Sequence, residues 1–175
     1  MKKITETNRL ILRELDSNDS EFFYNLNLDP EGLKYTGDVP FSSIVDAENF
    51  LINYSDYRKN RFGRWAVILK ETEAFIGWCG LKLNEENLVD IGFRFFKKEW
   101  GKGYATESAK AVLDYGFNIL KLKEIIGRAS KDNISSIRVL EKLNITFWKQ
   151  DRFMGVEESI YYRIKKNDYI KNISF

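Results

Sequence analysis

The feature that most constrains this chain is a glycine loop that leads from a predicted strand directly into a long predicted helix. The strand covers residues 88–96, the loop Trp100–Thr106 reads WGKGYAT, and the helix covers 105–120. Glycine lets the backbone approach a ligand because it has no Cβ. The first turn of a helix adds unpaired amides and a partial positive charge, so this segment predicts an anion-binding site.

Several interpretations of the loop compete. A P-loop needs four residues between its first glycine and Gly-Lys-Ser/Thr, and that spacing is absent from the sequence. A dinucleotide fingerprint fits Gly101-x-Gly103-x-x-Thr106 better, but it requires a carboxylate at the end of the next strand, and Glu124 stands at its beginning. A loop for the diphosphate of coenzyme A and a glycine turn without a ligand remain.

Strand and helix patterns around the loop predict one mixed α/β (α+β) domain over residues 1–175. The predicted strands and helices follow in the order β-α-α-β-β-β-α-β-α-β-β, with strands at 9–14, 64–70, 74–83, 88–96, 124–130, 147–153 and 158–165 and helices at 18–28, 44–60, 105–120 and 135–143. The three strands between 64 and 96 are separated by short polar turns and predict an antiparallel meander. Ser43 and Asp46 predict a helix cap at 44, and segment 28–43 is the long loop.

Composition excludes several classes of function. Lys and Arg total 28 against 26 Asp and Glu, so a basic face for nucleic acid is not expected. The absence of histidine rules out Ser-His-Asp catalysis and histidine-ligated metal, and Cys79 is the only cysteine. Residues 1–10 have no apolar run, and no window suits a membrane span, so we expect a cytoplasmic protein without metal or membrane partner.

Five segments together resemble the GNAT acyltransferase superfamily, most of all its Rim-type branch of ribosomal-protein N-terminal acetyltransferases. They are TNRLILREL (7–15), IGWCGL (76–81), DIGFRF (90–95), WGKGYATES (100–108) and NISSIRVLEKL (133–143). The resemblance covers nearly the whole chain. It implies a central, mostly antiparallel twisted sheet of about seven strands, flanked by about four helices.

The resemblance also implies acetyl-CoA as co-substrate and a set of residues that bind it. The loop binds the diphosphate mainly through backbone amides, the strand before it binds the pantetheine through its main chain, and Trp100 anchors the loop by packing. The implied residues are Phe93, Phe95, Trp100, Gly101, Lys102, Gly103, Tyr104, Ala105, Thr106, Asn133 and Ser136. Lys98 departs from the Arg or Gln that the family favours, and Asn144 replaces its glycine after E-K-L.

For catalysis the resemblance implies direct transfer of the acetyl group to an amine. Ser136 is then the hydrogen-bond partner or proton donor of the thiolate, and Asp90 is the preferred general base, with Glu157 and Glu158 as alternatives. Many relatives have a tyrosine acid where this chain has Leu140. Cys79 is interpreted as a small core residue, because reactive cysteines need an accessible, electropositive setting.

The implied function is N-acetylation of a primary amine, either a protein N-terminus or a small molecule. Segment 28–43 is expected to help form the acceptor pocket, which Tyr35, Trp65 and Trp78 could line. A non-catalytic acyl-CoA-binding module of the same fold is the alternative. Relatives often pair, which leaves a homodimer open.

Overall fold

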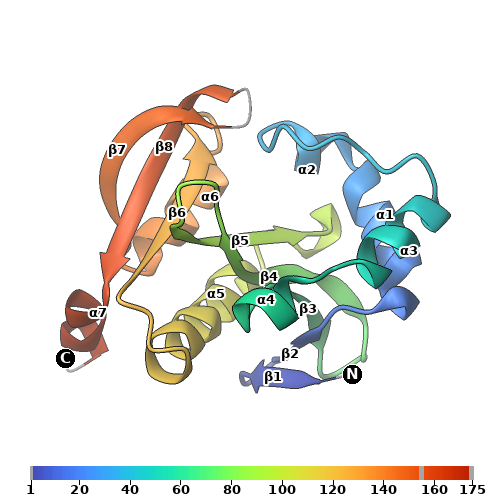
Figure 1. Ribbon diagram of the computed structural model, residues 1–175, viewed down its shortest axis with the longest axis horizontal. Helices are drawn as coiled ribbons and strands as arrows, with labels where there is room; N and C mark the ends of the chain where they lie inside the picture. The colour runs from blue at the N-terminus through green and yellow to red at the C-terminus, as the bar shows by residue number, and fades with distance from the viewer. Residues whose placement is uncertain (1, 154–155, 174–175) are drawn as a thin grey trace.

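One twisted sheet forms the centre of the fold in the computed structural model, which describes residues 2–153 and 156–173 (Figure 1). Its eight strands within these residues are β1 (Lys3–Glu6), β2 (Leu10–Glu14), β3 (Arg64–Leu69), β4 (Phe75–Leu83), β5 (Val89–Phe95), β6 (Glu124–Ser130), β7 (Thr146–Phe153) and β8 (Val156–Lys165). They lie in the order β1-β2-β3-β4-β5-β6-β8-β7. Only β5 and β6 pair in parallel, which confirms a mostly antiparallel sheet and the predicted meander of β3, β4 and β5.

The helices partly correct the sequence-based boundaries. They are α1 (Ser20–Leu28), α2 (Pro30–Leu33), α3 (Ile44–Ile52), α4 (Asp56–Asn60), α5 (Tyr104–Asp114), α6 (Ile134–Lys142) and α7 (Lys166–Ile173), and a π-helical turn at Tyr115–Ile119 extends α5. The expected helix 44–60 is wrong as one element, because it is interrupted at residues 53–55. No helix in the described ranges is long and apolar enough to cross a membrane.

The cap of α3 largely follows the prediction. The Ser43 hydroxyl accepts a hydrogen bond from the amide of Asp46 at 3.1 Å. The Asp46 carboxylate instead accepts from the amide of Ser42 at 3.1 Å, one residue earlier than a capping box requires. The hydroxyl therefore caps the helix, while the carboxylate stabilises the approach to it.

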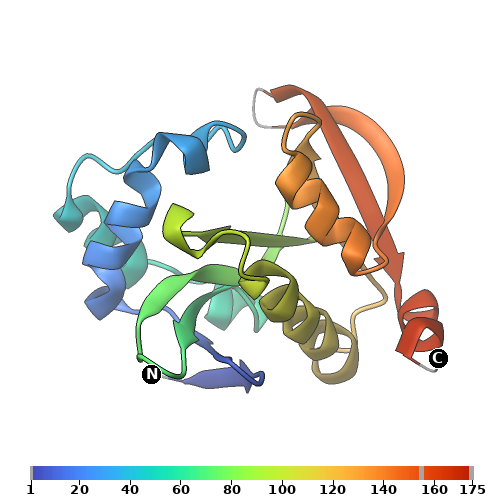
Figure 2. The same ribbon diagram turned by 180° about the vertical axis from the view of Figure 1, so that it is seen from behind.

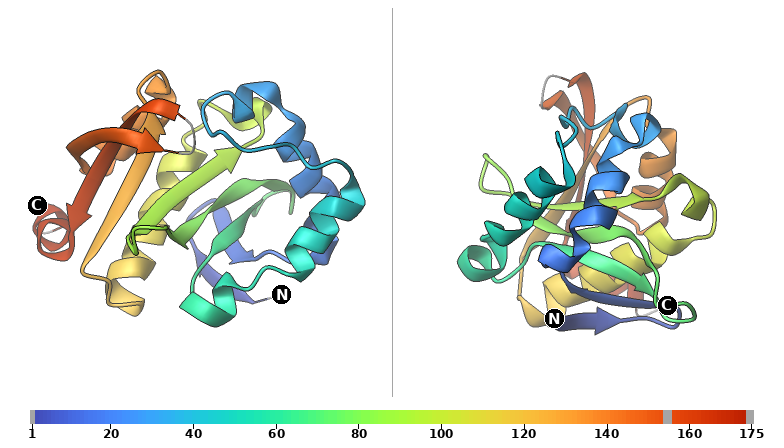
Figure 3. Two further views of the ribbon diagram at one scale, coloured as in Figure 1. Left: turned by 45° about the horizontal axis from the view of Figure 1, so that its top comes forward. Right: turned by 90° about the vertical axis from the view of Figure 1, so that its right-hand side faces the viewer.

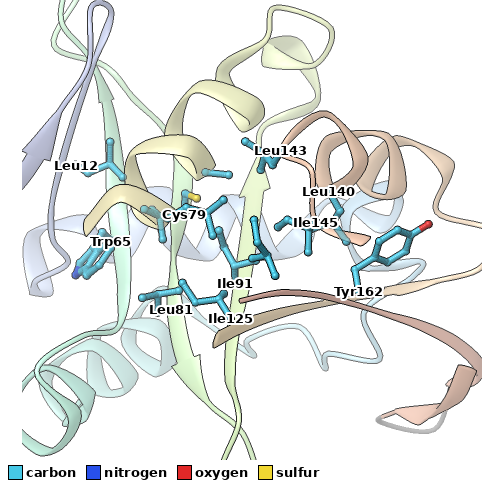
Figure 4. Packing of buried hydrophobic residues seen from close by; sticks show 14 of the residues in the cluster. Leu12, Trp65, Cys79, Leu81, Ile91, Ile125, Leu140, Leu143, Ile145 and Tyr162 are labelled. Atoms are coloured by element: carbon cyan, nitrogen blue, oxygen red, sulfur yellow. The ribbon is translucent and has the colours of Figure 1, made fainter. Parts of the chain in front are cut away.

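Two groups of helices cover opposite faces of the sheet. The view from behind shows α5 and α6 on one face, and the side view shows α3 on the opposite side from α5 (Figures 2 and 3). Apolar residues of α5 and α6 join the main core, whereas residues of α1 and α3 pack with Ala66 and Trp78 in a second cluster. The main core includes Trp65 and Cys79, both fully buried (Figure 4). Trp65 therefore packs inside the protein and does not line an acceptor pocket as expected, whereas the expectation for Cys79 is confirmed.

A separation between β5 and β6 interrupts the sheet. The two strands pair at Asp90–Ile126 and Ile91–Gly127. Beyond Ile91, β5 continues its pairing with β4 as far as Phe95, while β6 runs away toward β8 (Figure 1). One edge of the second half of β5 thus has no strand partner among the described residues.

Candidate functional site

The glycine loop has the backbone shape that its sequence predicts. Gly101 and Gly103 have φ of +77° and +84°, and Gly103 is the N-cap of α5. An L-residue in this left-handed region costs about 1–2 kcal/mol. A Cβ on Gly101 would meet nothing within 4 Å, so glycine is favoured there by its backbone conformation and not by crowding.

The loop presents a run of backbone amides at the positive end of α5. No described residue accepts a hydrogen bond from the amides of residues 101–106, whereas the next amide, of Glu107, donates to the carbonyl of Gly103 at 3.0 Å. Gly103 has no side chain that could cap the helix. The loop can therefore donate several hydrogen bonds to one anionic group, which fits the diphosphate of coenzyme A.

Side chains of the loop and its flanks hold it in place. The indole Nε1 of Trp100 donates to the carbonyl of Phe95 at 2.8 Å, which fastens the loop to the end of β5. The ammonium of Lys102 pairs with Glu99 at 2.9 Å. A hydrogen bond thus fastens the half-exposed Trp100 to β5, and the charge of Lys102 already has an acidic partner.

Glu107, one turn into α5, connects this loop to the N-terminal strands and was not singled out from the sequence. Its carboxylate accepts from the hydroxyl of Thr7 at 2.5 Å and from the Nε of Arg9 at 2.7 Å. Arg9 in turn donates to the carbonyl of Lys102 at 3.1 Å and lies over the ring of Tyr104. Partial burial raises the pKa of Glu107, but these hydrogen bonds outweigh burial and the net pKa is lowered. About 100 residues separate the partners, so spacing could not reveal the contact.

The free edge of β5 lies next to this loop. The amide of Phe96 donates to the carbonyl of Ile76 in β4 at 3.1 Å, so Phe96 faces β4. Because backbone direction alternates along a strand, the main chains of Phe93 and Phe95 face the opposite edge, where β6 has moved away. Their side chains pack in or against the main core, so binding groups at these residues are main-chain atoms.

Ser136 lies in the first turn of helix α6, which packs against β6 through Leu140. Asn133 caps the helix, since its Oδ1 accepts from the amide of Ser136 at 3.1 Å. Leu140 is buried against Gly127, where a Cβ would approach within 2.6 Å of Leu140 Cδ2. Ser136 and Leu140 are four residues apart and share a helix face, and no described group bonds the Ser136 hydroxyl. Leu140 therefore packs against the sheet, and Ser136 lies one turn before it on the same face of α6.

Asp90 lies on the opposite face of the sheet. Its Oδ2 accepts from the Nε of Arg128 at 2.7 Å, while its buried Oδ1 has no hydrogen-bond partner among the described residues. Burial raises the pKa of Asp90 to about 6, although the charges of Arg128, Lys82 and Arg64 favour the ionised form. Asp90 precedes the separation of β5 and β6 by one residue, which suits a proton acceptor at that point.

The other residues proposed for catalysis or for the acceptor lie in different settings. Trp78 lies on the same sheet face as Asp90, in the second apolar cluster, whereas Tyr35 is partly exposed and contacts Lys34. Glu158 forms an ion pair with Lys131 at the surface, and the side chain of Glu157 falls outside the described residues. Of the two candidate bases that can be placed, Asp90 is the less exposed, with its side chain 15% exposed against 52% for Glu158.

A groove of about 540 Å³ lies elsewhere, between the C-terminal end of α6, β7, β8 and α7. Its lining includes Glu141, Phe147, Tyr162 and Asp168. It contains none of the predicted site residues.

Comparison with known proteins agrees with this geometry. The acetyltransferase (GNAT) domain family matches residues 9–146, and the chain belongs to that family. It is 32% identical over 141 residues to a Bacillus licheniformis protein named uncharacterized N-acetyltransferase p20, covering 79% of each chain.

Two solved structures extend the comparison. A GNAT-family acetyltransferase from Bacillus anthracis superposes with a TM-score of 0.76 at 30% identity, over 93% of this chain and 98% of that one. A Vibrio cholerae spermidine N-acetyltransferase in complex with CoA and spermine shares the fold, with a TM-score of 0.80 at 22% identity, over 94% and 99% of the chains.

These findings confirm an acetyl-CoA-dependent N-acetyltransferase of mixed α/β GNAT fold. The sheet has eight described strands where seven were expected, and the helices are more numerous than the four expected. The Rim-type branch and the individual site residues stay predictions.

Proposed function

We propose that this enzyme transfers the acetyl group of acetyl-CoA directly to a primary amine, with both substrates bound at the separation between β5 and β6. One observation carries the proposal. Where the two strands part, the main-chain groups of Phe93 and Phe95 have no strand partner. The carboxylate of Asp90 lies close by on the sheet face opposite α5 and α6, and its buried Oδ1 has no hydrogen-bond partner among the described residues.

Three parts of the chain would hold the co-substrate. The amides of residues 101–106 would bind the diphosphate, the main chains of Phe93 and Phe95 would bind the pantetheine amides, and Asn133 and Ser136 would lie near the sulfur. The fit rests on unpaired donors at a helix N-terminus, which favour a group with several anionic oxygens. Bound acetyl-CoA supplies the acetyl thioester.

Two side chains would transfer the protons of the reaction. The amine nitrogen forms a bond to the acetyl carbon while the carbon–sulfur bond breaks, and the products are an N-acetyl amine and the CoA thiol. Asp90 would accept the proton that the ammonium group loses, through its unpaired Oδ1. The Ser136 hydroxyl would donate a hydrogen bond or proton to the departing sulfur, a role that Leu140 cannot serve. The second proton, which the nitrogen loses as the amide forms, would replace the one given to the sulfur, so that the CoA thiol and an unchanged serine result.

The acceptor is a primary amine of a protein N-terminus or of a small molecule. The Rim-type resemblance supports the first, whereas the shared fold with a spermidine N-acetyltransferase makes small amines candidates as well. A non-catalytic acyl-CoA-binding module remains the alternative, because Leu140 replaces the usual acid.

The proposal is tested by separating binding from transfer. CoA affinity is measured by calorimetric titration, and transfer is followed by thiol release on a panel of amines. Gly103→Val should weaken CoA binding at least about tenfold, because it strains the N-cap that presents the amides. Ser136→Ala should lower turnover while CoA affinity stays within about twofold.

The outcomes separate the alternatives. Circular dichroism establishes that both variants fold. Lys59→Gln, on the exposed surface of α4, serves as the control for substitution away from the site. A second glycine substitution, Gly63→Ala, is unsuitable for this purpose because its added Cβ would clash with Tyr57. Tight CoA binding without release of thiol above background on any amine would favour the binding module. Unchanged CoA affinity in Gly103→Val would place the co-substrate elsewhere.

A further inference from the structure

Three arginines share one sheet face with Trp78 and Asp90. Arg94 stands opposite Trp78 in the β4–β5 register, and Arg64 lies two residues before Ala66, which is opposite Trp78 in the β3–β4 register. Arg128 lies two residues after Ile126, the partner of Asp90. We call Arg64, Trp78, Asp90, Arg94 and Arg128 the acceptor face, because α5, α6 and the glycine loop belong to the opposite side.

Two of the three arginines already have acidic partners. Arg94 is nearly buried and pairs with Asp38, and it also donates to Asn27. Arg128 is buried as well and donates to Asp90 at 2.7 Å. These two guanidinium groups are therefore neutralised within the protein.

Arg64 differs from both. Its guanidinium lies 4.6 Å from the centre of the Trp78 ring, and no carboxylate in the described ranges forms an ion pair with it. Its side chain is only partly exposed, and its charge acts on both Asp90 and Arg94. Stacking on an aromatic ring orients a guanidinium but leaves its N–H groups free. Arg64 is thus an oriented cation that still lacks an anion.

Two buried polar atoms of the acceptor face also lack partners. Asp90 Oδ1 can accept a hydrogen bond, and the Trp78 Nε1–H can donate one, yet neither has a partner among the described residues. Such atoms are costly to leave unpaired. An ammonium group would satisfy the carboxylate oxygen, and an anion would satisfy the guanidinium of Arg64.

We propose that the acceptor is a primary amine that carries a carboxylate, which Arg64 binds while the amino group faces Asp90. This inference rests on the proposed function and names its substrate class. A polyamine would instead bring additional positive charges next to Arg64 and the exposed Lys82, whose own charges would repel them. The carboxylate can belong to a free amino acid or to an acidic side chain near a peptide N-terminus.

The test compares acceptors that differ only in the carboxylate. Phenylalanine is paired with phenethylamine and 4-aminobutanoate with 4-aminobutanamide as free amines, and the peptides Ser-Asp-Gly amide and Ser-Asn-Gly amide represent N-termini. Spermidine is included. We expect kcat/KM to be about tenfold or more higher for the carboxylate member of at least one pair, since an ionic hydrogen bond contributes on that scale. The pair that responds identifies the source.

Substitution of Arg64 then assigns the preference. Arg64→Gln should reduce it to about threefold or less, mainly through KM, whereas Arg64→Lys should retain part of it. Arg58→Gln, which removes the same charge from the exposed surface of α4, should leave it unchanged. A preference for spermidine or the uncharged members, or an unaltered preference in Arg64→Gln, would overturn the inference while acetyl transfer itself stands. Failure of the wild-type enzyme to acetylate any amine would overturn the proposed function, and this inference with it.

Discussion

At the scale of single residues, Asp90 combines burial with a cationic neighbour. Burial raises its pKa to about 6, although Arg128, Lys82 and Arg64 each favour the charged form. The group is therefore mostly ionised at neutral pH, yet it binds a proton more readily than an ordinary aspartate. Arg128 donates to Oδ2, while Oδ1 has no hydrogen-bond partner among the described residues, so in the proposed function Arg128 would position the carboxylate.

The pKa of Asp90 leads to a prediction about how turnover depends on pH. Turnover of the wild-type enzyme should fall as pH drops through about 6, because protonated Asp90 cannot accept a proton from the amine. Asp90→Asn should lower kcat by about 10²- to 10⁴-fold and abolish this acidic limb, with CoA affinity nearly unchanged. Steady-state rates from pH 5 to 8 and calorimetry check both parts. A variant that keeps wild-type turnover would remove Asp90 from catalysis.

The sequence predicted correctly those residues whose conformation depends only on their neighbours along the chain. Gly101 and Gly103 have positive φ, as a loop that leads into a helix requires, and the apolar spacing placed α5 close to its true start. Arg64 and Glu107 acquire their roles through contacts with distant strands. Register across a sheet is set by packing of whole strands, so no local pattern shows which side chains will meet.

At the scale of elements, the same distinction explains the errors in the fold. Strand β6 matches its predicted bounds, 124–130, because most of its residues are buried and it pairs with β8 along its whole length. Strand β1 has four half-exposed or exposed residues without a strong apolar pattern, and it is defined by its pairing with β2. The expected helix 44–60 ends early, since Asn53 caps α3 and a new turn begins at Ser55. Short elements stabilised by neighbours are those that periodicity misses.

The junction between α5 and the N-terminal strands yields a second prediction. Glu107→Gln should lower the free energy of unfolding by about 1–2 kcal/mol and weaken CoA binding, because Arg9 would no longer be held beside the loop. The pKa of Glu107 is lowered from 4.5, so its stabilisation is present above about pH 4.5 and is lost as pH falls through the lowered value. Denaturant titrations at pH 7 and below pH 4 measure the difference.

A matched substitution controls for loss of charge alone. Glu6→Gln removes a carboxylate from an exposed ion pair with Lys70 and should change stability far less than Glu107→Gln, because solvent screens exposed charges. Equal effects of Glu6→Gln and Glu107→Gln would show that the Glu107 contacts have no special role.

At the scale of the whole molecule, one core joins the two parts of the sheet. Strands β5 and β6 share only a short pairing, yet residues of β2, β4, β6 and β8 belong to the same apolar cluster beneath α5 and α6 (Figure 4). The single thiol, Cys79, lies in that cluster, and burial raises its pKa to about 12. Its access to solvent therefore requires the core to open.

We therefore expect Cys79 to react with thiol reagents only when the protein unfolds globally. A disulfide reagent should label the native protein at least about 10³-fold more slowly than the protein in denaturant, since a domain of ordinary stability is rarely open. A Cys79→Ala, Ser42→Cys variant, with its thiol at an exposed position, should react promptly in the native state. Rapid labelling of native wild-type protein would contradict the burial of Cys79. Slow labelling would also let released CoA be followed without background from the enzyme.

A fully paired sheet would separate the two faces of the molecule along its whole length, whereas β5 and β6 stop pairing after Ile91 and Gly127. In the proposed function, each substrate would approach from its own face of the sheet, and the two would meet where β5 has no partner strand. Neither would have to wait for the other to enter or leave, so initial-rate kinetics should show no compulsory order of addition.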